Sequence, residues 1–329
     1  MKALITGGAG FIGGYLAQDL IDFGHEVVIA DNFSRGVEDG FLKDLESRGA
    51  NLVTVDLLDP SSLKTLGGGY DCIFHLAAII GVENVMGRPY DVLRKNAELL
   101  FNLIDFAHMQ TKLSRFVFAS TSEVYAGTLQ FFDMAVPTPE DTPLTITPLE
   151  HPRTSYMLSK IYGEASIRQS GLPFTIVRPH NFYGPRMGMS HVVPELLKKA
   201  HTAPQDGTLE VFSVDHRRTF CYISDAVTAM RLLAENDNCA GEVFNIGNQA
   251  PEIAIGDLAK IVLKVTGRDD LTIAPLPATS GSPTRRCPNT QRMTAATEFE
   301  PLVSIEDGVR ATYSWYRDHI FEGTEISAK

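Results

Sequence analysis

Six short apolar runs alternate with longer amphipathic stretches in the first half of the chain. The runs are apolar at consecutive positions and rich in β-branched and aromatic residues, which is typical of parallel strands covered on both faces. They predict buried strands at 3–7, 26–31, 51–56, 72–78, 115–120 and 174–179. Apolar positions with helical spacing lie between them, at 12–22, 39–48, 89–110 and 154–170. This alternation predicts an α/β fold with a doubly wound parallel sheet, built from right-handed crossovers.

The pattern changes after about residue 180. Helical periodicity continues, but only two short strand patterns accompany it, and one long stretch rich in Pro, Gly, Ser and Thr predicts an ordered loop. The helices are predicted at 192–202, 224–235, 255–266 and 305–320, the strands at 209–212 and 243–246, and the loop at 274–290, with a frayed tail from 323. We therefore predict a first domain over 1–180 and a smaller, mainly helical α/β region over 181–329, partly interleaved with it.

Composition and charge narrow the kinds of partner. The 329 residues are 44% hydrophobic and 21% charged, as in ordinary globular proteins, and the net charge of -11 argues against a nucleic-acid-binding protein, which needs a basic face. No apolar run approaches the roughly 20 residues that span a bilayer, and no signal-peptide pattern follows Met1, so we expect no membrane partner and a cytoplasmic location. The four cysteines are far apart in sequence, which predicts free thiols and no metal site.

The first predicted strand runs into the sequence "GGAGFIGG", in which Gly7, Gly10 and Gly13 are three residues apart. Glycines there permit a tight turn and let the backbone approach a pyrophosphate at the start of the following helix, as in Rossmann-type domains. Asp31 closes the second strand, where a carboxylate binds the adenosine ribose hydroxyls and repels a 2′-phosphate, which predicts NAD. A helix or turn cap is the alternative for Asp31, and Arg35 leaves some room for NADP.

Further cofactor contacts are expected at the ends of the next strands. Asp56 ends the third strand and could contact the adenine edge or cap a turn, and "HLAA" at 75–78 places small residues where the backbone must pass close to a cofactor. The candidate cofactor-binding residues are Gly7, Gly10, Phe11, Ile12, Gly13, Asp31, Asn32, Asp56, Leu57, Leu76, Ala77, Ala78 and Lys160.

The fifth predicted strand ends in polar residues, Ser120, Thr121, Ser122 and Glu123. Polar groups there cost free energy unless they are hydrogen-bonded or face a cleft, and in open α/β sheets the ligand cleft lies at the carboxyl ends of the strands. We expect Thr121 or Ser122 to hold a substrate hydroxyl, and Glu123 to act as an acid or base. A simple cap or an ion pair with an arginine is the alternative for Glu123.

Tyr156 and Lys160 lie four residues apart on a predicted helix, so both side chains leave the same face. An ammonium beside a phenol lowers the phenol pKa, which would let Tyr156 act as a base near neutral pH. We therefore predict a proton-transfer pair, with a solvated Tyr–Lys face as the alternative.

These motifs, together with "RPHNFYGPR" at 178–186 and "RRTFCYISDAV" at 217–227, occur in an order that resembles the extended short-chain dehydrogenase/reductases that modify nucleotide sugars. The resemblance covers essentially the whole chain. It implies a tightly held NAD, a nucleoside-diphosphate sugar in the C-terminal half and transient oxidation at sugar C4, with Tyr156 taking the C4 hydroxyl proton. It also implies that Lys160 binds the nicotinamide ribose.

The same resemblance implies substrate contacts in the second half of the chain. Asn181 would touch the sugar or diphosphate, and Arg218 the phosphates, with Arg186 as a further substrate-binding candidate. A planar guanidinium suits phosphate oxygens independently of any resemblance. An edge salt bridge is the alternative for Arg218.

Three reactions can follow a 4-ketone: loss of carbon dioxide from a C5 carboxylate, loss of water across C5–C6, or return of hydride to the other face. The string "ASTSEVY" is similar to UDP-glucuronate decarboxylases and to some sugar 4,6-dehydratases. In the decarboxylases, Ser122, Glu123 and Arg286 match residues around the uronate carboxylate. A decarboxylase is therefore the leading prediction, with a 4,6-dehydratase or a 4-epimerase as alternatives.

Two departures weaken the decarboxylase prediction. Ala126 replaces the usual glycine after "VY", and Glu83, another substrate-binding candidate, stands where some uronate-specific epimerases carry Arg and would repel a uronate if it faced the pocket. A non-catalytic NAD-binding module and a plain alcohol dehydrogenase are alternatives from other classes. Tyr156, Lys160 and the phosphate-type arginines argue against both.

The apolar stripes of 89–110 and 154–170 exceed what the sheet needs, and the resemblance implies that these helices pair across a two-fold axis in a homodimer.

Overall fold

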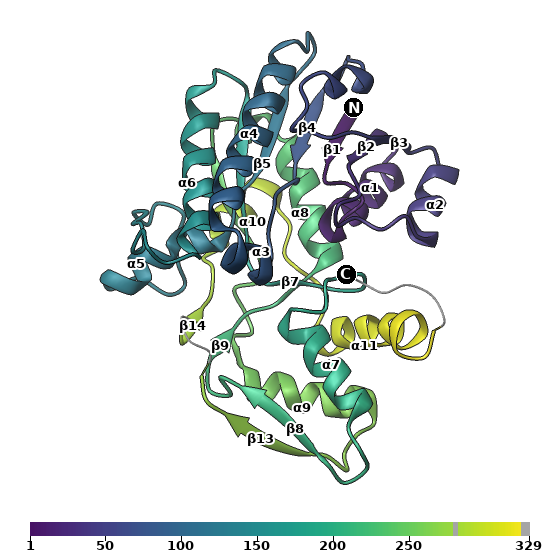
Figure 1. Ribbon diagram of the computed structural model, residues 1–329, viewed down its shortest axis with the longest axis vertical. Helices are drawn as coiled ribbons and strands as arrows, with labels where there is room; N and C mark the ends of the chain where they lie inside the picture. The colour runs from purple at the N-terminus through teal and green to yellow at the C-terminus, as the bar shows by residue number, and fades with distance from the viewer. Residues whose placement is uncertain (279–281, 324–329) are drawn as a thin grey trace.

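The computed structural model describes residues 1–278 and 282–323. Seven strands form one sheet in the order β11-β6-β5-β4-β1-β2-β3, and every neighbouring pair is parallel (Figure 1). The strands are β1 (Lys2–Thr6), β2 (Glu26–Asp31), β3 (Asn51–Thr54), β4 (Cys72–His75), β5 (Arg115–Ala119), β6 (Phe174–Pro179) and β11 (Val243–Ile246). The strand order reverses between β1 and β4, which is where such sheets bind ligands. The predicted fold class and all six strands are confirmed, but β3, at the edge of the sheet, is half-buried or exposed at every residue rather than buried as predicted.

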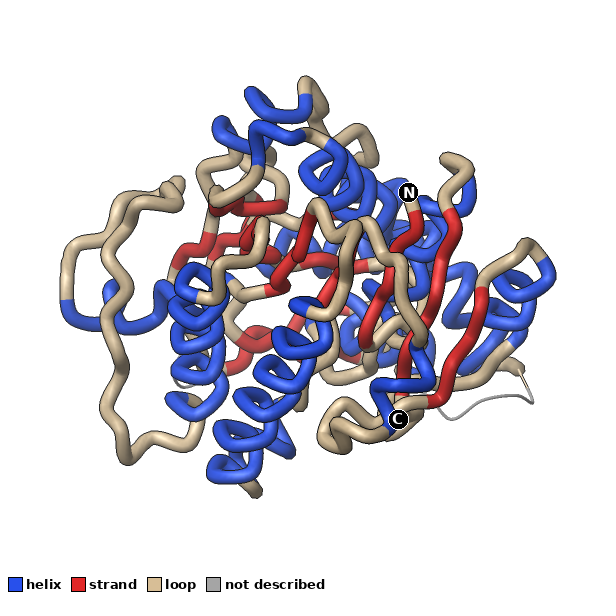
Figure 2. The backbone as a smooth tube through the Cα atoms, turned by 90° about the horizontal axis from the view of Figure 1, so that it is seen from above, coloured by secondary structure: helices blue, strands red, loops and turns tan. Residues whose placement is uncertain are grey.

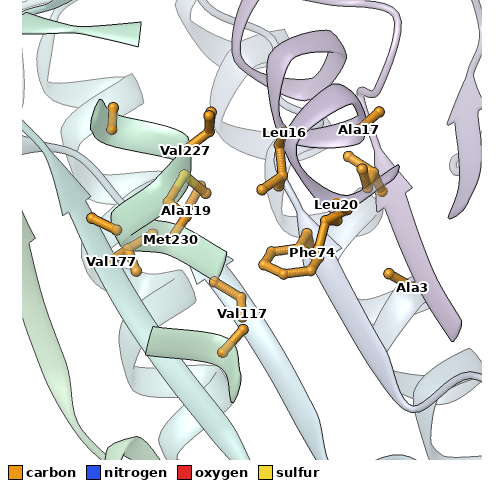
Figure 3. Close-up of a cluster of buried hydrophobic side chains, with 14 of the residues drawn as sticks. Ala3, Leu16, Ala17, Leu20, Phe74, Val117, Ala119, Val177, Val227 and Met230 are labelled. Atoms are coloured by element: carbon orange, nitrogen blue, oxygen red, sulfur yellow. The ribbon is translucent and has the colours of Figure 1, made fainter. Parts of the chain in front are cut away.

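Helices cover both faces of this sheet, as Figure 2 shows from above. One face is covered by α1 (Phe11–Asp22) and α8 (Ile223–Glu235), the other by α4 (Pro89–His108) and α6 (Thr154–Gln169). Successive residues of β5 alternate between the two layers: Val117 and Ala119 pack with α1 and α8 (Figure 3), whereas Phe116 and Phe118 pack with α4. Burial on both faces explains why the strands are apolar at consecutive positions.

Three longer helices and several short strands form a second body below the sheet, around its own apolar core (Figure 1). Its main elements are α7 (Val192–Thr202), α9 (Ile255–Thr266), α11 (Ile305–Tyr316) and the parallel pair β8 (Thr208–Phe212) and β13 (Thr272–Leu276). Two smaller sheets connect the bodies: β7 (Phe182–Tyr183) with β10 (Cys221–Tyr222), and β9 (Arg217–Arg218) with β12 (Ile253–Ala254) and β14 (Arg285–Arg286).

The structure refines several predicted boundaries. The segment 274–290, predicted as a loop, contains the end of β13 and all of β14, while 279–281 and the predicted frayed tail at 324–329 lie outside the described residues. Shorter helices are α2 (Gly40–Ser47), α3 (Val82–Gly87), α5 (Ala126–Phe131) and α10 (Gln291–Thr297). The predicted strand 243–246 joins the large sheet as β11, so the second half of the chain completes the first. In the described part of the chain, no helix combines the length and apolarity needed to cross a membrane.

Candidate active site

A cavity of about 900 Å³ runs along the carboxyl ends of the sheet strands and continues between the two bodies. Residues predicted as cofactor-binding line one part of it, and the predicted catalytic residues line another. The predicted residues that line it are Gly7, Gly10, Phe11, Ile12, Gly13, Asp31, Asn32, Asp56, Leu57, Leu76, Ala77, Ala78, Thr121, Ser122, Glu123, Tyr156, Lys160, Asn181, Arg186 and Arg286. Glu83 and Arg218 are not among the lining residues.

The glycine-rich turn after β1 is shaped for a close approach of backbone. Gly7 has a φ of 70°, and a Cβ there would lie 2.8 Å from the Ala77 amide nitrogen. A Cβ on Gly13 would lie 2.4 Å from the Gly7 carbonyl oxygen. Because side chains at these positions would collide with backbone, the turn keeps the start of α1 open to a pyrophosphate. The residues present therefore fit a dinucleotide.

Asp31 organises the same end of the cavity. Its carboxylate accepts hydrogen bonds from the Ala9 N–H at 3.0 Å and the Phe33 N–H at 2.9 Å, so it caps both turns. Burial raises the pKa of Asp31, and these N–H groups oppose that shift. The Asp56 carboxylate likewise accepts from the Leu58 N–H at 3.0 Å. The turn-capping alternatives are thus observed for both residues, while their ribose and adenine contacts stay predictions.

The polar residues after β5 have separate partners. Ser120 donates to Glu164 at 2.6 Å, inside a buried ion pair in which Arg178 binds Glu164 at 2.7 Å. Thr121 accepts from the Glu123 N–H at 3.2 Å and shares a hydrogen bond with Tyr156. Ser120 is therefore structural, whereas Thr121 lies beside the phenol as the sequence predicts for a substrate-orienting hydroxyl.

Lys160 is fixed by the end of β5 and not by Tyr156. Its Nζ donates to the Ala119 carbonyl at 2.7 Å and lies 6.0 Å from the centre of the Tyr156 ring. Burial lowers the pKa of Lys160 to about 8. The pKa of Tyr156 is raised, by burial first and by Glu123 second, against opposing contributions from Thr121 and Arg35. The predicted lowering of the Tyr156 pKa by Lys160 is therefore absent, because burial dominates.

Glu123 and Arg286 form an ion pair with Nη2 to Oε1 at 2.8 Å. Glu123 follows β5, and Arg286 reaches it from β14, which pairs in parallel with β9. Arg286 is the main reason that the pKa of Glu123 is lowered, and it outweighs the effect of burial. The structure thus brings together two residues, far apart in sequence, that were predicted to surround a uronate carboxylate.

A sequence profile of the NAD dependent epimerase/dehydratase family matches residues 3–247. The chain belongs to this family. This membership confirms the resemblance found in the sequence, the NAD cofactor and the class of enzyme.

Relatives of this family enzyme cover nearly its whole length. A UDP-N-acetyl-alpha-D-glucosaminuronate decarboxylase of Bacillus cytotoxicus is 32% identical, over 96% of this chain and 98% of the relative. UDP-glucuronic acid decarboxylase 1 of Arabidopsis thaliana is 29% identical, over 99% of this chain and 72% of the relative. Among solved structures, the UDP-glucuronic acid 4-epimerase of Bacillus cereus, in complex with UDP-glucuronic acid and NAD, matches with a TM-score of 0.81 and 28% identity, over 96% of this chain and 99% of that one.

The predicted substrate-binding residues of the enzyme occupy different positions. Asn181 lines the cavity and donates to the Thr219 carbonyl at 2.9 Å, with a left-handed φ of 47°. Arg218 donates to the Ser282 hydroxyl at 2.9 Å and the Pro283 carbonyl at 2.6 Å, so it holds the segment that leads into β14. Burial first and the charge of Arg286 second lower the pKa of Arg218 to about 10. Its phosphate contact stays a prediction.

The two departures noted in the sequence have structural explanations. Glu83 lies in the first turn of α3 with an exposed side chain outside the cavity lining, so the geometry gives no support to repulsion of a uronate. Ala126 begins α5 with a φ of -61°, a conformation that needs no glycine. The turn after "VY" is replaced by a helix.

Sequence reasoning missed several residues that line the cavity. Arg35 lies 3.4 Å from the Ile80 carbonyl oxygen and acts electrostatically on Tyr156, although the sequence suggested only a bearing on NADP. Trp315 reaches the cavity from α11, near the other end of the chain. Arg35 could have been suspected because it follows Asp31 in a polar loop. Trp315 could not, since only tertiary packing places α11 there.

Proposed function

We propose that this enzyme decarboxylates a UDP-linked uronate through a transient ketone at C4. The observation that carries the proposal is the Glu123–Arg286 ion pair in the cavity that also holds Tyr156. A guanidinium is the side chain best suited to bind a carboxylate, and here its present partner is itself a carboxylate that a uronate would replace. The two relatives named above, both uronate decarboxylases, support the same assignment.

The side chains have separable tasks in this proposal. Tyr156 accepts the C4 hydroxyl proton, which Thr121 orients, and bound NAD supplies the hydride acceptor for C4. With a ketone at C4, the C5 carboxylate becomes a β-keto acid; its C–C bond breaks, carbon dioxide leaves, and the electron pair passes to the C4 oxygen. Arg286 holds the carboxylate beforehand. Glu123, released from Arg286, is placed to move the proton that C5 then needs. The hydride taken from C4 would then return to it while Tyr156 gives its proton back to the C4 oxygen, so that the ketone is reduced again.

Lys160 supports this chemistry as a fixed hydrogen-bond donor. Its Nζ donates to the Ala119 carbonyl and lies 6.0 Å from the centre of the Tyr156 ring, so it is held beside the phenol without taking the Tyr156 proton itself. A nicotinamide ribose bound next to Lys160 would accept hydrogen bonds from the ammonium N–H groups that do not bind the Ala119 carbonyl.

A 4-epimerase acting on the same uronate is the second candidate. Arg286 would bind the carboxylate in either enzyme, and one of the similar solved structures is a UDP-glucuronic acid 4-epimerase. A 4,6-dehydratase is less well supported, because its acid or base near C5–C6 would be tied to Arg286 without a substrate carboxylate to displace it.

Product analysis by mass spectrometry and NMR separates the candidates. The enzyme is incubated with NAD and, in turn, UDP-glucuronate, UDP-N-acetylglucosaminuronate and UDP-glucose. Loss of the mass of carbon dioxide supports the proposal. Unchanged mass with inverted C4 would mean epimerisation, loss of water from UDP-glucose would mean dehydration, and either result would refute a decarboxylase.

Arg286 and its neighbour Arg285 provide a matched pair of variants. Arg286→Gln is expected to lower turnover of the uronate by at least about a hundredfold, because it removes a charged hydrogen-bond partner of the reacting group. Arg285→Gln is the control, since Arg285 pairs with Glu252 on the surface at 2.7 Å. Turnover and bound NAD are measured for both. Equal losses in the two variants would show that Arg286 does not act on the carboxylate.

The oligomeric state and location belong to the same proposal. Phe101 of α4 and Tyr162 of α6 are exposed and contact each other edge to face at 5.8 Å. Side by side, the two helices offer an apolar face on which a second copy would form a four-helix contact. The homodimer and the cytoplasmic location both stay predictions.

A further inference from the structure

Arg186 is placed on the cofactor side of the cavity, although the sequence predicted a substrate contact. It follows β7 in the second half of the chain, yet its Nε donates to the Asp39 carboxylate of the first half at 2.8 Å. Asp39 is also the N-cap of α2, where it accepts from the Leu42 N–H. Both charged side chains are more than nine-tenths buried. The pair therefore joins the two halves of the chain beneath the surface.

Two further residues complete this contact. The guanidinium of Arg186 lies over the Phe41 ring, 4.6 Å from its centre. On the other side, Gly14 leaves room for it: a Cβ at position 14 would lie 2.8 Å from Nη1 of Arg186 and 3.0 Å from the Phe41 ring. Gly14 stands outside the Gly7, Gly10, Gly13 pattern, so the dinucleotide turn does not account for it. We call Gly14, Asp39, Phe41 and Arg186 the clamp.

Arg186 is held there against its own backbone preference. Its φ of 64° is left-handed, a region that residues other than glycine seldom adopt. Nη1 is buried and has no hydrogen-bond partner among the described residues. The guanidinium stays in place, with Nη1 unsatisfied and a strained backbone, because Asp39, Phe41 and the Ala9 carbonyl, which accepts from Nη2 at 3.5 Å, hold it.

The clamp closes the loop that borders the cofactor end of the cavity. Asp31 lines that end from the end of β2, Arg35 and Asp39 line it from the loop that follows, and Arg186 lines it from the opposite body. Movement of this loop away from α1 would free a dinucleotide seated between the loop and the glycine turn. The Arg186–Asp39 pair opposes that movement, because opening it would leave two buried charges unpaired.

From this arrangement we infer that Arg186 positions the cofactor loop and sets the rate at which the enzyme releases NAD, rather than binding the nucleotide sugar. Arg186 acts through Asp39, so it is a positioning residue. The inference rests on NAD use by the family and does not depend on which reaction follows the 4-ketone.

The test follows release of a cofactor in variants of the clamp. Purified enzyme is loaded with NADH, an excess of NAD is added, and the loss of protein-bound NADH fluorescence gives the release rate. Arg186→Gln, Asp39→Asn and Gly14→Ala are each expected to speed release at least about tenfold, since each breaks or displaces a buried ion pair. The double variant Asp39→Asn/Arg186→Gln should release NADH no faster than the single variants, because the two residues act as one unit.

Controls separate the clamp from a general loosening. Gly40→Ala changes another glycine of the same region, with no atom within 4 Å of the added carbon, and should leave release unchanged. Affinity for UDP, measured by calorimetry, should also be unchanged in the clamp variants. Arg186→Lys keeps the charge but cannot cover Phe41 in the same way, so it should release NADH at an intermediate rate.

Specific results would overturn the inference. An unchanged rate of NADH release in the clamp variants, together with weaker UDP binding in Arg186→Gln, would show that Arg186 binds the nucleotide sugar instead. Equally fast release in Gly40→Ala would show that the effect is not specific to the clamp. If Arg186→Gln does not fold, as judged by thermal unfolding, Gly14→Ala decides, because it leaves both charges in place.

Discussion

At the scale of single residues, burial sets the charge states on which the chemistry depends. The phenol of Tyr156 and the ammonium of Lys160 are both shifted toward their neutral forms, because each is removed from water. Glu123 is shifted the other way by Arg286. A cation bound in the cavity would therefore act on a Tyr156 phenol that is protonated in its absence.

The shift at Lys160 predicts a pH dependence of stability. The folded pKa of about 8 lies below the ordinary 10.5, so between these values the unfolded chain binds more protons and the free energy of unfolding rises with pH. Lys160→Met removes this dependence. Its stability relative to the natural enzyme should fall from pH 7.5 to pH 10 by up to about 3 kcal/mol, since one pKa unit corresponds to about 1.4 kcal/mol.

Urea unfolding of both proteins at a series of pH values measures this difference. Only its change with pH is informative, because Lys160→Met also leaves the Ala119 carbonyl without its donor. A difference that is constant over the whole range would mean that the pKa of Lys160 is not lowered.

Local sequence patterns predict where a side chain lies when a single turn or helix determines which residues surround it. The glycines of the turn and the Tyr156–Lys160 pair line the cavity, as their spacing suggests, because a turn and a helix face determine where they lie. Arg186 was assigned to the substrate from the sequence, whereas its buried partner is Asp39 of the opposite body. That pairing depends on how the two bodies meet, which no local pattern encodes.

At the scale of elements, α6 carries both Tyr156 and Lys160, and it lies close enough to the sheet for Lys160 to donate to the Ala119 carbonyl of β5. Gly163, one turn further along α6, makes this approach possible: a Cβ there would lie 2.4 Å from the Phe118 ring and 3.3 Å from Leu100 of α4. Close packing at one glycine thus places Tyr156 and Lys160 against β5.

Gly163→Ala is expected to destabilise the enzyme by about 1–2 kcal/mol. Overpacking a core costs about 1–3 kcal/mol, while alanine in a helix regains up to about 1 kcal/mol over glycine. Chemical denaturation measures the change, and turnover should fall with it because α6 moves. Gln169→Ala, an exposed change on the same helix, is the control; a Gly163→Ala variant more stable than this control would contradict the packing argument.

Long elements were predictable from periodicity and short ones were not. Strands β1 to β6 and the main helices have enough residues to show a repeat. By contrast, β14 has two residues inside a stretch rich in Pro, Gly, Ser and Thr, and only its pairing with β9 makes it a strand. The residue that β14 carries into the cavity, Arg286, was found through resemblance instead.

At the scale of the whole molecule, the apolar face of α4 and α6 predicts self-association. Phe101→Glu would bury a charge in the proposed four-helix contact and should convert dimer to monomer at micromolar concentrations. Light scattering coupled to size exclusion measures the mass. Leu302→Glu, at another exposed apolar residue, should leave the mass unchanged. A natural enzyme that is already monomeric would refute the homodimer.

The place of β11 at the edge of the large sheet has a consequence for synthesis. When only the first 180 residues have left the ribosome, all strands of that sheet except β11 have been made. At that stage β6 is an unpaired edge because β11 is missing, and α1 is not yet covered by α8. An unpaired edge and an uncovered apolar face favour association with other chains. We therefore expect the emerging chain to need protection until about residue 246 has appeared, although its dinucleotide turn was made first.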